Sequence, residues 1–415
     1  MQTIFRKDIQ YYKFCLYGFF KNLRFFEAFL VLFFLEKGLS FFEIGLLYSL
    51  REITIYIFEI PTGIIADSFG RRKTMLLAFV FYILSFFVFF LSGFFEAFVV
   101  AIVFYSLGDA FRTGNHKAMV IEYLSFKGWL QDKVHYYGNT RSWSQMGSAL
   151  SAITGGFIVF YTGSFRYIFL FSIIPYILDL ILVITYPRIL DGDIQKFNKR
   201  LVKKEFQKLF RHYRNSLVKA TVLKAVFNLS VFSGYYKAVK DYLQPLVKTY
   251  AISVPLLLTL TIEQRSSLLV GFVFFIIFLL SSFASRISGR VSTWFDNLAI
   301  PLNLTLIIGF FAGILSGIFF NMGFFLVSIV LFVVIYMIEN LRKPIGVAFI
   351  SEAVDKRIMA SAISTDSLLQ SILAAIIAPV IGLLADHLGV GYGIVIITVI
   401  LAISLPLYFA IHTRK

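Results

Sequence analysis

The chain is built from long apolar stretches that are separated by short polar segments. Each stretch is long enough for an α-helix to cross a bilayer, which takes about 20 apolar residues. The stretches do not alternate apolar and polar residues and are about twice as long as a membrane β-barrel strand, so strands are not expected. The pattern predicts twelve membrane-spanning helices in two sets of six, at 12–35, 41–66, 75–93, 95–124, 137–160 and 165–187, then at 217–249, 264–284, 297–319, 323–350, 359–384 and 392–411.

The composition excludes several classes of protein. Hydrophobic residues make up 59% of the 415 residues and charged residues only 15%. Because soluble domains carry about 25% charged residues, a soluble globular enzyme is excluded. The single cysteine, Cys15, excludes an intrachain disulfide and a thiolate metal site, and the 5 histidines form no cluster at zinc spacing. We therefore expect no metal, no cofactor and no catalytic residues.

The excess of positive charge predicts the orientation of the helices. Lys and Arg number 39 against 23 Asp and Glu, which gives a net charge of +16. The Lys and Arg residues concentrate in the connections that lie on the cytoplasmic side if the N-terminus is cytoplasmic. Cytoplasmic loops of membrane proteins are generally enriched in Lys and Arg. We expect a multi-pass protein of the cell (inner) membrane with both termini cytoplasmic. The charge thus indicates orientation rather than a nucleic-acid partner.

The longest polar stretch, residues 188–216, separates the two sets of helices. It predicts an N-terminal six-helix bundle at 1–187 and a C-terminal six-helix bundle at 217–415. Apolar residues recur at helical spacing among its lysines and arginines, which predicts an amphipathic helix lying on anionic lipids. We expect the protein to be a monomer.

The two halves repeat several polar positions. A shift of about 230 residues matches Asp109, Arg112 and Glu122 to Glu339, Arg342 and Glu352. Matched charges within apolar spans predict two pseudo-symmetric bundles with a site near the middle of the membrane. The fold class is thus an all-α polytopic membrane protein with 12 transmembrane helices.

A motif follows the second predicted span, Gly63-Ile-Ile-Ala-Asp67-Ser-Phe-Gly70-Arg71-Arg72-Lys73. It resembles the signature of the major facilitator superfamily, and the resemblance extends to the whole chain through the two sets of six spans and the basic linker. It implies transport by alternating access. The residues assigned to a cytoplasmic gate are Gly63, Asp67, Gly70, Arg71, Arg72, Glu122 and Glu352. The fifth span lacks the Gly-Pro pair that marks many drug and proton antiporters.

Charged residues within the spans are the candidates for function. Each costs about 2.5–3.5 kcal/mol if it faces lipid, so they are expected to face a wet cavity or one another. The candidates for binding a coupling proton are Glu27, Asp109 and Glu339, followed by Glu52 and Glu59. The candidates for binding substrate are Arg24, Arg112, His116, Asn228, Tyr235, Tyr236 and Arg342. The alternative is that neighbouring charges within a helix only neutralise each other.

Two further sets of polar residues leave alternatives open. Arg141, Gln145, Asp366 and Gln370 either line the pathway or pair across the bundle interface. Asp179 has no evident local partner in the sequence, and packing is as good an explanation as function.

The sequence therefore predicts a secondary active transporter that moves a small organic solute, anionic or amphipathic, with H⁺ as the coupling ion. One alternative is a polyspecific drug efflux antiporter. Another, from a different class, is a non-transporting receptor or scaffold on the same fold, because a fold does not by itself establish a function.

Overall fold

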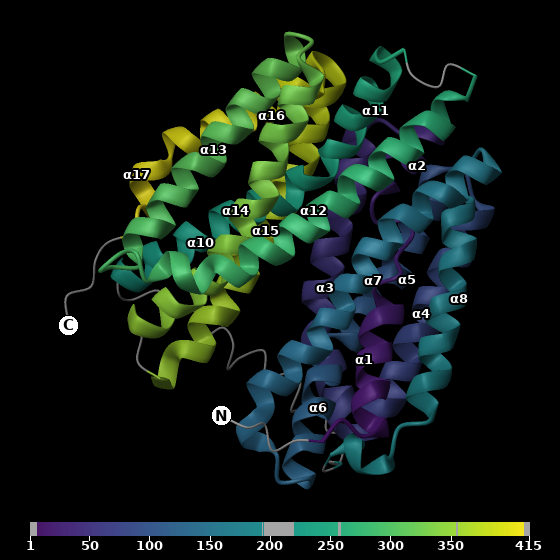
Figure 1. Cartoon of the computed structure of the whole chain (residues 1–415), viewed down its shortest axis with the longest axis vertical. Coiled ribbons are helices and arrows are strands. Elements are labelled where there is room, and N and C mark those ends of the chain that lie inside the picture. Colours follow the sequence, from purple (N-terminus) through teal and green to yellow (C-terminus); the bar gives the residue numbers. More distant parts are fainter. Residues whose placement is uncertain (1–5, 193, 195–219, 256–258, 354–355, 411–415) are drawn as a thin grey trace. The chain divides into compact units, whose positions relative to one another are not determined.

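The computed structural model describes residues 6–192, 194, 220–255, 259–353 and 356–410, and within these ranges all regular structure is helical (Figure 1). Contacts divide the chain into two compact units. Unit 1 comprises Met1–Phe29 and Thr54–Glu205, and unit 2 comprises Leu30–Ile53 and Phe206–Lys415. The contacts thus join residues 30–53, which the sequence assigns to the first bundle, to the second half of the chain. The predicted linker helix lies outside the described residues, apart from residues 188–192 and 194.

Unit 1 is formed by long helices that pack side by side around an aromatic interior. Helix α4 packs on α5 and α8, and α1 packs on α7 and α8. Tyr176 of α8 lies edge-on to Phe86 of α4, with ring centroids 4.9 Å apart. The elements are α1 (Ile9–Lys21), the C-terminal part of α3 (Phe41–Phe69), α4 (Arg71–Leu91), α5 (Phe95–Arg112), α6 (Asn115–Phe126), η1 (Leu130–Asp132), α7 (Lys133–Thr162), α8 (Tyr167–Ile184) and η2 (Arg188–Asp191).

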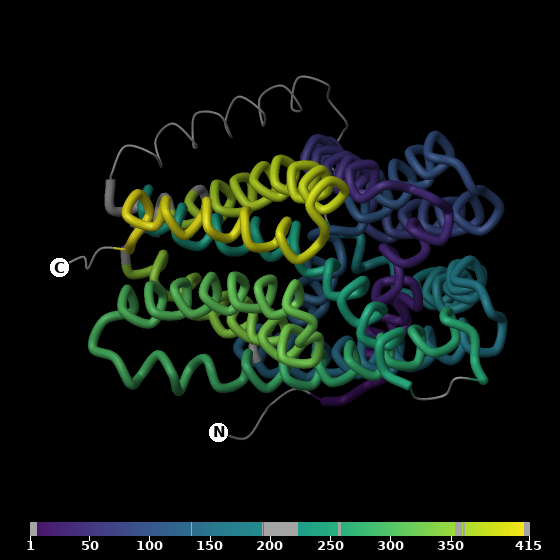
Figure 2. The backbone as a smooth tube through the Cα atoms, turned by 90° about the horizontal axis from the view of Figure 1, so that it is seen from above, coloured from purple at the N-terminus to yellow at the C-terminus, as the bar shows by residue number. Residues whose placement is uncertain are grey.

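Unit 2 is also entirely helical in its described part. Helix α13 packs on α14 and α16, and α10 packs on α15, as a second view also shows (Figure 2). The elements are α2 (Leu30–Glu36), the N-terminal part of α3, α10 (Ala220–Val239), η3 (Lys240–Tyr242), α11 (Leu243–Ser253), α12 (Ile262–Ser292), α13 (Ala299–Asn321), α14 (Phe325–Ala353), α15 (Lys356–Leu388), α16 (Val390–Ile403) and α17 (Leu405–Tyr408).

The N-terminal part of α3 packs closely on α15 within unit 2. A side chain added at Gly45 would meet the backbone of Ala378 and Pro379, and one added at Gly382 would meet the backbone of Phe41. The carboxylate of Asp386 accepts hydrogen bonds from the backbone N–H groups of Phe41 and Phe42 at the start of α3, each at 2.8 Å. These glycines therefore serve helix packing.

Four of the predicted spans are broken, and one of these, the twelfth span, is divided between α16 and α17. The first span ends as α1 at Lys21 and resumes as α2 at Leu30. The fourth is interrupted between α5 and α6, where Gly114 has a φ of +83°, a backbone conformation that glycine adopts without strain. The seventh is divided by η3. Hydropathy alone cannot reveal such breaks, because the residues on each side remain apolar.

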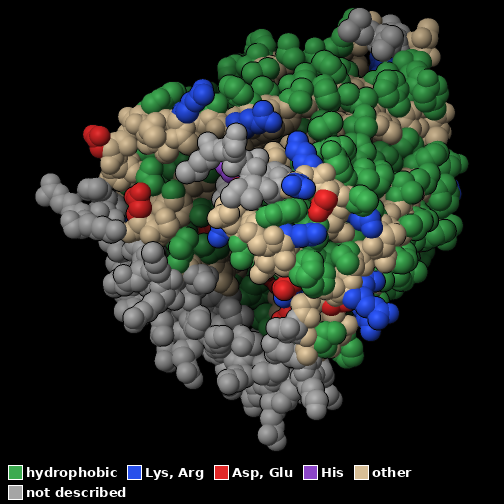
Figure 3. Space-filling model, turned by 60° about the horizontal axis from the view of Figure 1, so that its bottom comes forward, with side chains coloured by type: hydrophobic (Ala, Val, Ile, Leu, Met, Phe, Trp, Pro, Cys, Tyr) green, Lys and Arg blue, Asp and Glu red, His purple; other side chains and the backbone are tan. Residues whose placement is uncertain are grey.

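The outer surface of the helices is apolar, as a bilayer requires. Along α8, exposed side chains recur every three or four residues at Phe171, Ile174, Ile177, Ile181 and Ile184, which places them on one face of the helix. Broad hydrophobic areas are visible in the space-filling view, with charged side chains gathered on part of the face turned forward (Figure 3). By length and composition, 6 helices of the described residues qualify as membrane spans.

Candidate functional site

The buried centre of unit 1 is a cluster of charged residues around Asp109. Its carboxylate accepts a hydrogen bond from the Tyr82 hydroxyl at 2.5 Å and pairs with Arg112 at 3.1 Å and with Arg24 at 3.8 Å. Arg112 Nε also donates to the Tyr82 hydroxyl at 3.0 Å, and Arg24 lies 4.0 Å from Glu27. Two arginines and two acids therefore balance each other in charge.

The breaks in the helices bring this cluster together. Arg24 and Glu27 lie on the non-helical segment between α1 and α2, and Arg112 is the last residue of α5, before the turn at Gly114. Irregular backbone at membrane depth is tolerated where it lines a cavity or is buried in protein. The sequence predicts one span over 95–124, but His116 lies on α6, beyond the helix that carries Asp109 and Arg112.

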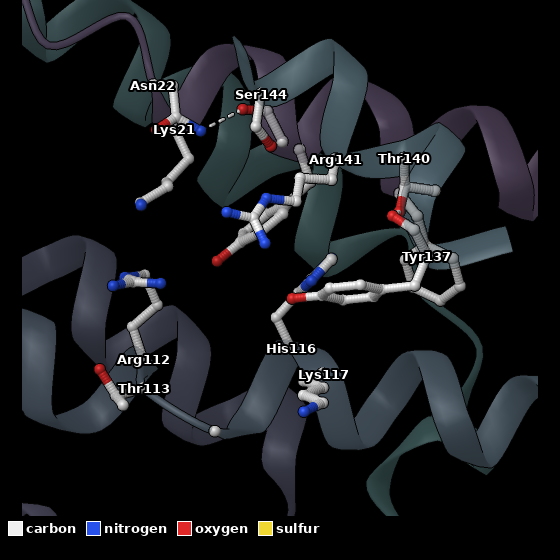
Figure 4. A pocket seen from close by; sticks show the side chains of 14 residues that line it. Lys21, Asn22, Arg112, Thr113, His116, Lys117, Tyr137, Thr140, Arg141 and Ser144 are labelled. Atoms are coloured by element: carbon white, nitrogen blue, oxygen red, sulfur yellow. Dashed lines mark hydrogen bonds between the residues drawn. The ribbon is translucent and has the colours of Figure 1, made fainter. Parts of the chain in front are cut away.

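A cavity of about 290 Å³ adjoins the cluster within unit 1. Its lining includes four cationic side chains, Lys21, Arg112, Lys117 and Arg141, together with His116. Figure 4 shows Lys21, Arg112 and Arg141 pointing into the same space from different elements. No Asp or Glu occurs among the described residues that line it. Since the Asp109 cluster is already balanced, the cavity has an excess of positive charge.

The predicted binding residues of unit 1 are placed differently around this cavity. Arg112 and His116 line it, whereas Arg24 does not. The His116 ring stacks on Tyr17, with centroids 3.8 Å apart and planes inclined by 13°. Arg141 also lines the cavity, whereas Gln145 on the same helix is half-buried outside the lining, and the pathway role of both stays a prediction.

Arg342 of unit 2 lies in a different setting from that expected of a substrate-binding residue. Its side chain is 1% exposed. It donates to Asn228 O at 3.0 Å and Asn228 Oδ1 at 2.8 Å, to Thr305 Oγ1 at 3.0 Å, and to the backbone carbonyl of Leu302. Its guanidinium also lies over the Phe232 ring, 5.0 Å from the centroid. These bonds tie α10, α13 and α14 together.

Asn228 and Tyr235 are likewise engaged inside unit 2. Asn228 Nδ2 donates to Asn303 at 3.0 Å, and the Tyr235 hydroxyl is 2.9 Å from Thr398 Oγ1. Neither lines the cavity of unit 1 described above or a second cavity, of unit 2, described below. Their substrate-binding role stays a prediction, but the contacts in this structure are those of helix packing.

The predicted acids of unit 2 are each paired or hydrogen-bonded. Glu339 accepts from Ser233 Oγ at 2.9 Å and lies 3.4 Å from Lys343 Nζ, so Lys343 rather than Arg342 is its cationic partner. Asp366 accepts from Ser230 at 2.7 Å and from Gln370 at 2.8 Å. Asp366 and Gln370 thus have hydrogen-bond partners within unit 2.

A second cavity, of about 220 Å³, lies within unit 2. Glu52 pairs there with Lys237 at 3.0 Å and accepts from Ser371 Oγ at 2.9 Å. Tyr236 also lines this cavity. Its charged lining residues are Arg51, Glu52, Lys237, Lys240, Asp241 and Lys343. Glu59, one heptad from Glu52, falls in unit 1 and is exposed.

Residues of the motif that follows the second predicted span take part in a small ion network. Arg71 pairs with Glu122 at 3.3 Å and with Asp67 at 3.8 Å. Gly70 precedes α4 with a φ of +97°. The carboxylate of Asp191 accepts from the backbone N–H of Arg72 at 2.8 Å and so caps α4. The gating role of these residues and of Gly63 stays a prediction, as does that of Glu352, which is exposed on α14.

Several residues of the site were not among the sequence candidates. Lys21 and Lys117 line the first cavity, and Asp191 caps α4. Lys21 gave the same signal as Arg24, a charge inside a predicted span. Asp191 gave none, because its place within the polar stretch at 188–216 does not reveal a capping contact.

Comparison with known proteins places these features in context. The model of the Major Facilitator Superfamily matches residues 14–365. The Uncharacterized MFS-type transporter YxaM of Bacillus subtilis (strain 168) is 32% identical over 87 residues. That match covers 20% of this chain and only 21% of the relative.

Solved structures resemble the chain over nearly its full length. The nucleoside transporter NupG superposes with a TM-score of 0.75 at 15% identity, covering 96% of this chain and 99% of that one. The peptide transporter POT gives 0.70 at 14% identity, covering 97% and 96%. A bacterial homolog of the human lysosomal transporter Spinster gives 0.71 at 15% identity, covering 97% of each. At such identities the likeness shows the fold, and it confirms the predicted all-α polytopic class.

Proposed function

The chain belongs to the Major Facilitator Superfamily, and we propose that it is a secondary active transporter that moves a small anionic organic solute by alternating access, coupled to protons. Membership confirms the family that the loop motif resembles. It supports a transporter rather than an enzyme, and with the apolar helices it makes the chain a multi-pass membrane protein. A cytoplasmic location of both termini in the cell (inner) membrane is part of the proposal and rests on the loop charges.

The cavity of unit 1 carries the proposal of an anionic solute. Lys21, Lys117 and Arg141 add three positive charges to a neutral cluster, and no acid of the described residues lines the cavity. A cationic, partly enclosed cavity attracts anions and can hold a carboxylate or phosphate by charge-assisted hydrogen bonds. The planar guanidinium of Arg141, which faces Lys21 and Arg112 (Figure 4), suits two-point binding of such a group.

Proton coupling is supported by acids that lie within the membrane-spanning part of the chain. Glu339 is 2% exposed and Asp179 is 0% exposed. Such residues are costly in a bilayer and often serve proton or ion pathways. Because protons can neutralise these acids while arginines stay charged, proton binding would make the interior more attractive to an anion.

The experiment starts with purified full-length protein and a thermal-shift screen of anionic, neutral and cationic solutes. Any hit is then reconstituted in proteoliposomes, and its uptake is measured with and without a pH gradient. We expect anionic solutes to stabilise the protein and to accumulate when the gradient is applied. Selective stabilisation by cationic dyes would instead favour the drug efflux alternative. Stabilisation without flux in any direction would favour a receptor.

Two variants test the cavity directly. Arg141→Gln and Lys117→Gln each remove one lining charge, and we expect roughly 10- to 100-fold weaker anion binding, the value of a charge-assisted hydrogen bond of about 1.5–3 kcal/mol. Lys248→Gln on α11 is the matched control, because Lys248 lines neither cavity. Equal affinity in all three variants would refute the assignment of this cavity to the solute.

A further inference from the structure

Asp179 is the most deeply buried acid outside the cluster already described. It lies in the C-terminal half of α8 with a relative exposure of 0%. Among the described residues, no group donates a hydrogen bond to either oxygen of its carboxylate. An ionised carboxylate without hydrogen bonds is costly to bury, by several kcal/mol. Neutral aspartic acid is the form that such a site holds at lower cost.

The surroundings of Asp179 connect it to the cavity of unit 1. The cations whose fields act on it are Lys21 and Arg112, and both line that cavity. Tyr17, which also lines the cavity, interacts with both Asp179 and Arg112. Asp179 thus interacts with two cations and a tyrosine that line the cavity, although it does not line the cavity itself.

The remaining titratable groups near Asp179 come from α8 itself and from the helices packed on it. Tyr186, just beyond α8, interacts with Asp179, and Tyr136 of α7 interacts with Tyr186. Helix α4 contributes Tyr82, whose hydroxyl is already bonded to Asp109. None of these tyrosines supplies a fixed charge at neutral pH. Apart from its burial, the charges that act on Asp179 are therefore those of Lys21 and Arg112.

Asp109 lies in the same unit but in the opposite environment. One tyrosine and two arginines act on its carboxylate, and such contacts favour the ionised form. An acid that is held ionised by three groups is a poor carrier of a proton. We propose that Asp179, rather than Asp109, is the proton-binding acid of unit 1, and that Tyr17 and Lys21 connect it to the cavity.

The role of Asp179 in transport rests on the proposed function. The assignment predicts how proton binding to Asp179 and anion binding to the cavity affect each other. An anion bound near Lys21 and Arg112 would offset the positive charge that favours ionised Asp179. The acid would then keep its proton while the anion is bound. By linkage, a proton on Asp179 strengthens anion binding to the same extent. Proton and anion would therefore be carried together.

The protonation of Asp179 can be measured without any substrate. Infrared spectra of the full-length protein in nanodiscs are recorded from pH 5 to pH 9, in H₂O and D₂O. We expect the carbonyl band of a protonated carboxylic acid at neutral pH in wild-type protein, absent in Asp179→Asn and retained in Asp109→Asn. A band of equal intensity in wild type and Asp179→Asn would overturn the proposal.

A second variant tests the proposal even if Asp179→Asn does not fold. Lys21→Met removes one of the two cations that act on Asp179 but keeps the acid, and we expect its carboxylic acid band to persist to a higher pH than in wild type. A band that titrates as in wild type would contradict the proposed role of Lys21 and the connection to the cavity.

Transport then separates this inference from the proposed function. With an anionic solute from the screen, Asp179→Asn should lose uptake driven by a pH gradient and keep solute exchange across equal pH. Driven uptake that survives in Asp179→Asn but is lost in Glu27→Gln or Glu339→Gln would overturn the inference and leave the proposed function standing. Wild-type protein without driven uptake would refute proton coupling, while the infrared band would still decide whether Asp179 binds a proton.

Discussion

Replacement of Asp109 by asparagine should destabilise unit 1 strongly. The change is nearly isosteric, so it removes charge rather than volume. It leaves Arg112, 3.1 Å away, and Arg24, 3.8 Å away, with Glu27 as the only acid of the cluster. Removing one partner of a buried ion pair costs about 3–5 kcal/mol, because the remaining charge is buried without compensation.

The cost can be expressed as a melting temperature. For units of about 150–250 residues, 1 kcal/mol corresponds to about 2–4 °C. We therefore expect Asp109→Asn to melt roughly 6–20 °C below wild type.

The chain contains its own reporter of unfolding. Cys15 is the single cysteine of the sequence and is fully buried in α1 of unit 1. A dye that becomes fluorescent on reacting with thiols will label it only when unit 1 opens. Heating the purified protein with this dye therefore measures the stability of the unit that contains Asp109.

Asp67→Asn provides the matched control for this measurement. Asp67 is also an acid paired with an arginine, at 3.8 Å, but its side chain is 55% exposed. Exposed pairs contribute at most about 1 kcal/mol, so the control should melt within about 4 °C of wild type. If Asp109→Asn melts at the same temperature as wild type, the carboxylate is not the counter-charge of the two arginines.

Three further predictions follow from single contacts. Asp67→Asn should fold normally but slow solute flux, because it weakens the ion pairs that Arg71 forms with Asp67 and Glu122. Unchanged flux and unchanged labelling of a cysteine engineered on the cytoplasmic side would contradict a gating role. Arg342→Met should lower the free energy of unfolding by about 3–5 kcal/mol, because the N–H groups of Arg342 donate hydrogen bonds to Asn228, Thr305 and Leu302. Anion affinity measured by calorimetry should be unchanged. Lost affinity at full stability would restore the predicted binding role of Arg342. Gly114→Ala should cost about 1–2 kcal/mol by thermal melting, because it places a side chain at a φ of +83°, and Gly138→Ala within α7 is the control; equal melting of both variants would show that the turn is not strained.

Apolar runs were sufficient to predict the membrane helices but not their breaks. The runs that contain α4, α8 and α13 are continuous helices close to their predicted ranges. The run at 12–35 predicts one helix as well, although its charged residues at 24 and 27 lie on irregular backbone. Hydropathy averages over a window of residues, so it registers the length of a span and misses a local change of backbone conformation.

Charged residues in the predicted spans include residues that line a cavity and residues that only pack helices together, and the sequence does not distinguish the two. Arg112 and Arg342 occupy matched positions in the two halves, and the sequence assigns both to substrate binding. Arg112 lines a cavity, whereas Arg342 is enclosed by hydrogen-bond acceptors of unit 2. The partners of Arg342 come from residues about 40 and 110 positions away, and no spacing in the sequence shows that they converge.

Asp109 and Asp179 show why the role of an acid depends on its neighbours. Both are aspartates of apolar helices, and both are nearly inaccessible to solvent. Asp109 receives a tyrosine hydroxyl and two arginines, whereas no described residue donates a hydrogen bond to Asp179. Burial opposes ionisation in each case, and hydrogen-bond donors together with nearby cations decide which acid keeps its charge. The same type of residue can therefore hold the unit together at one position and exchange a proton at the other.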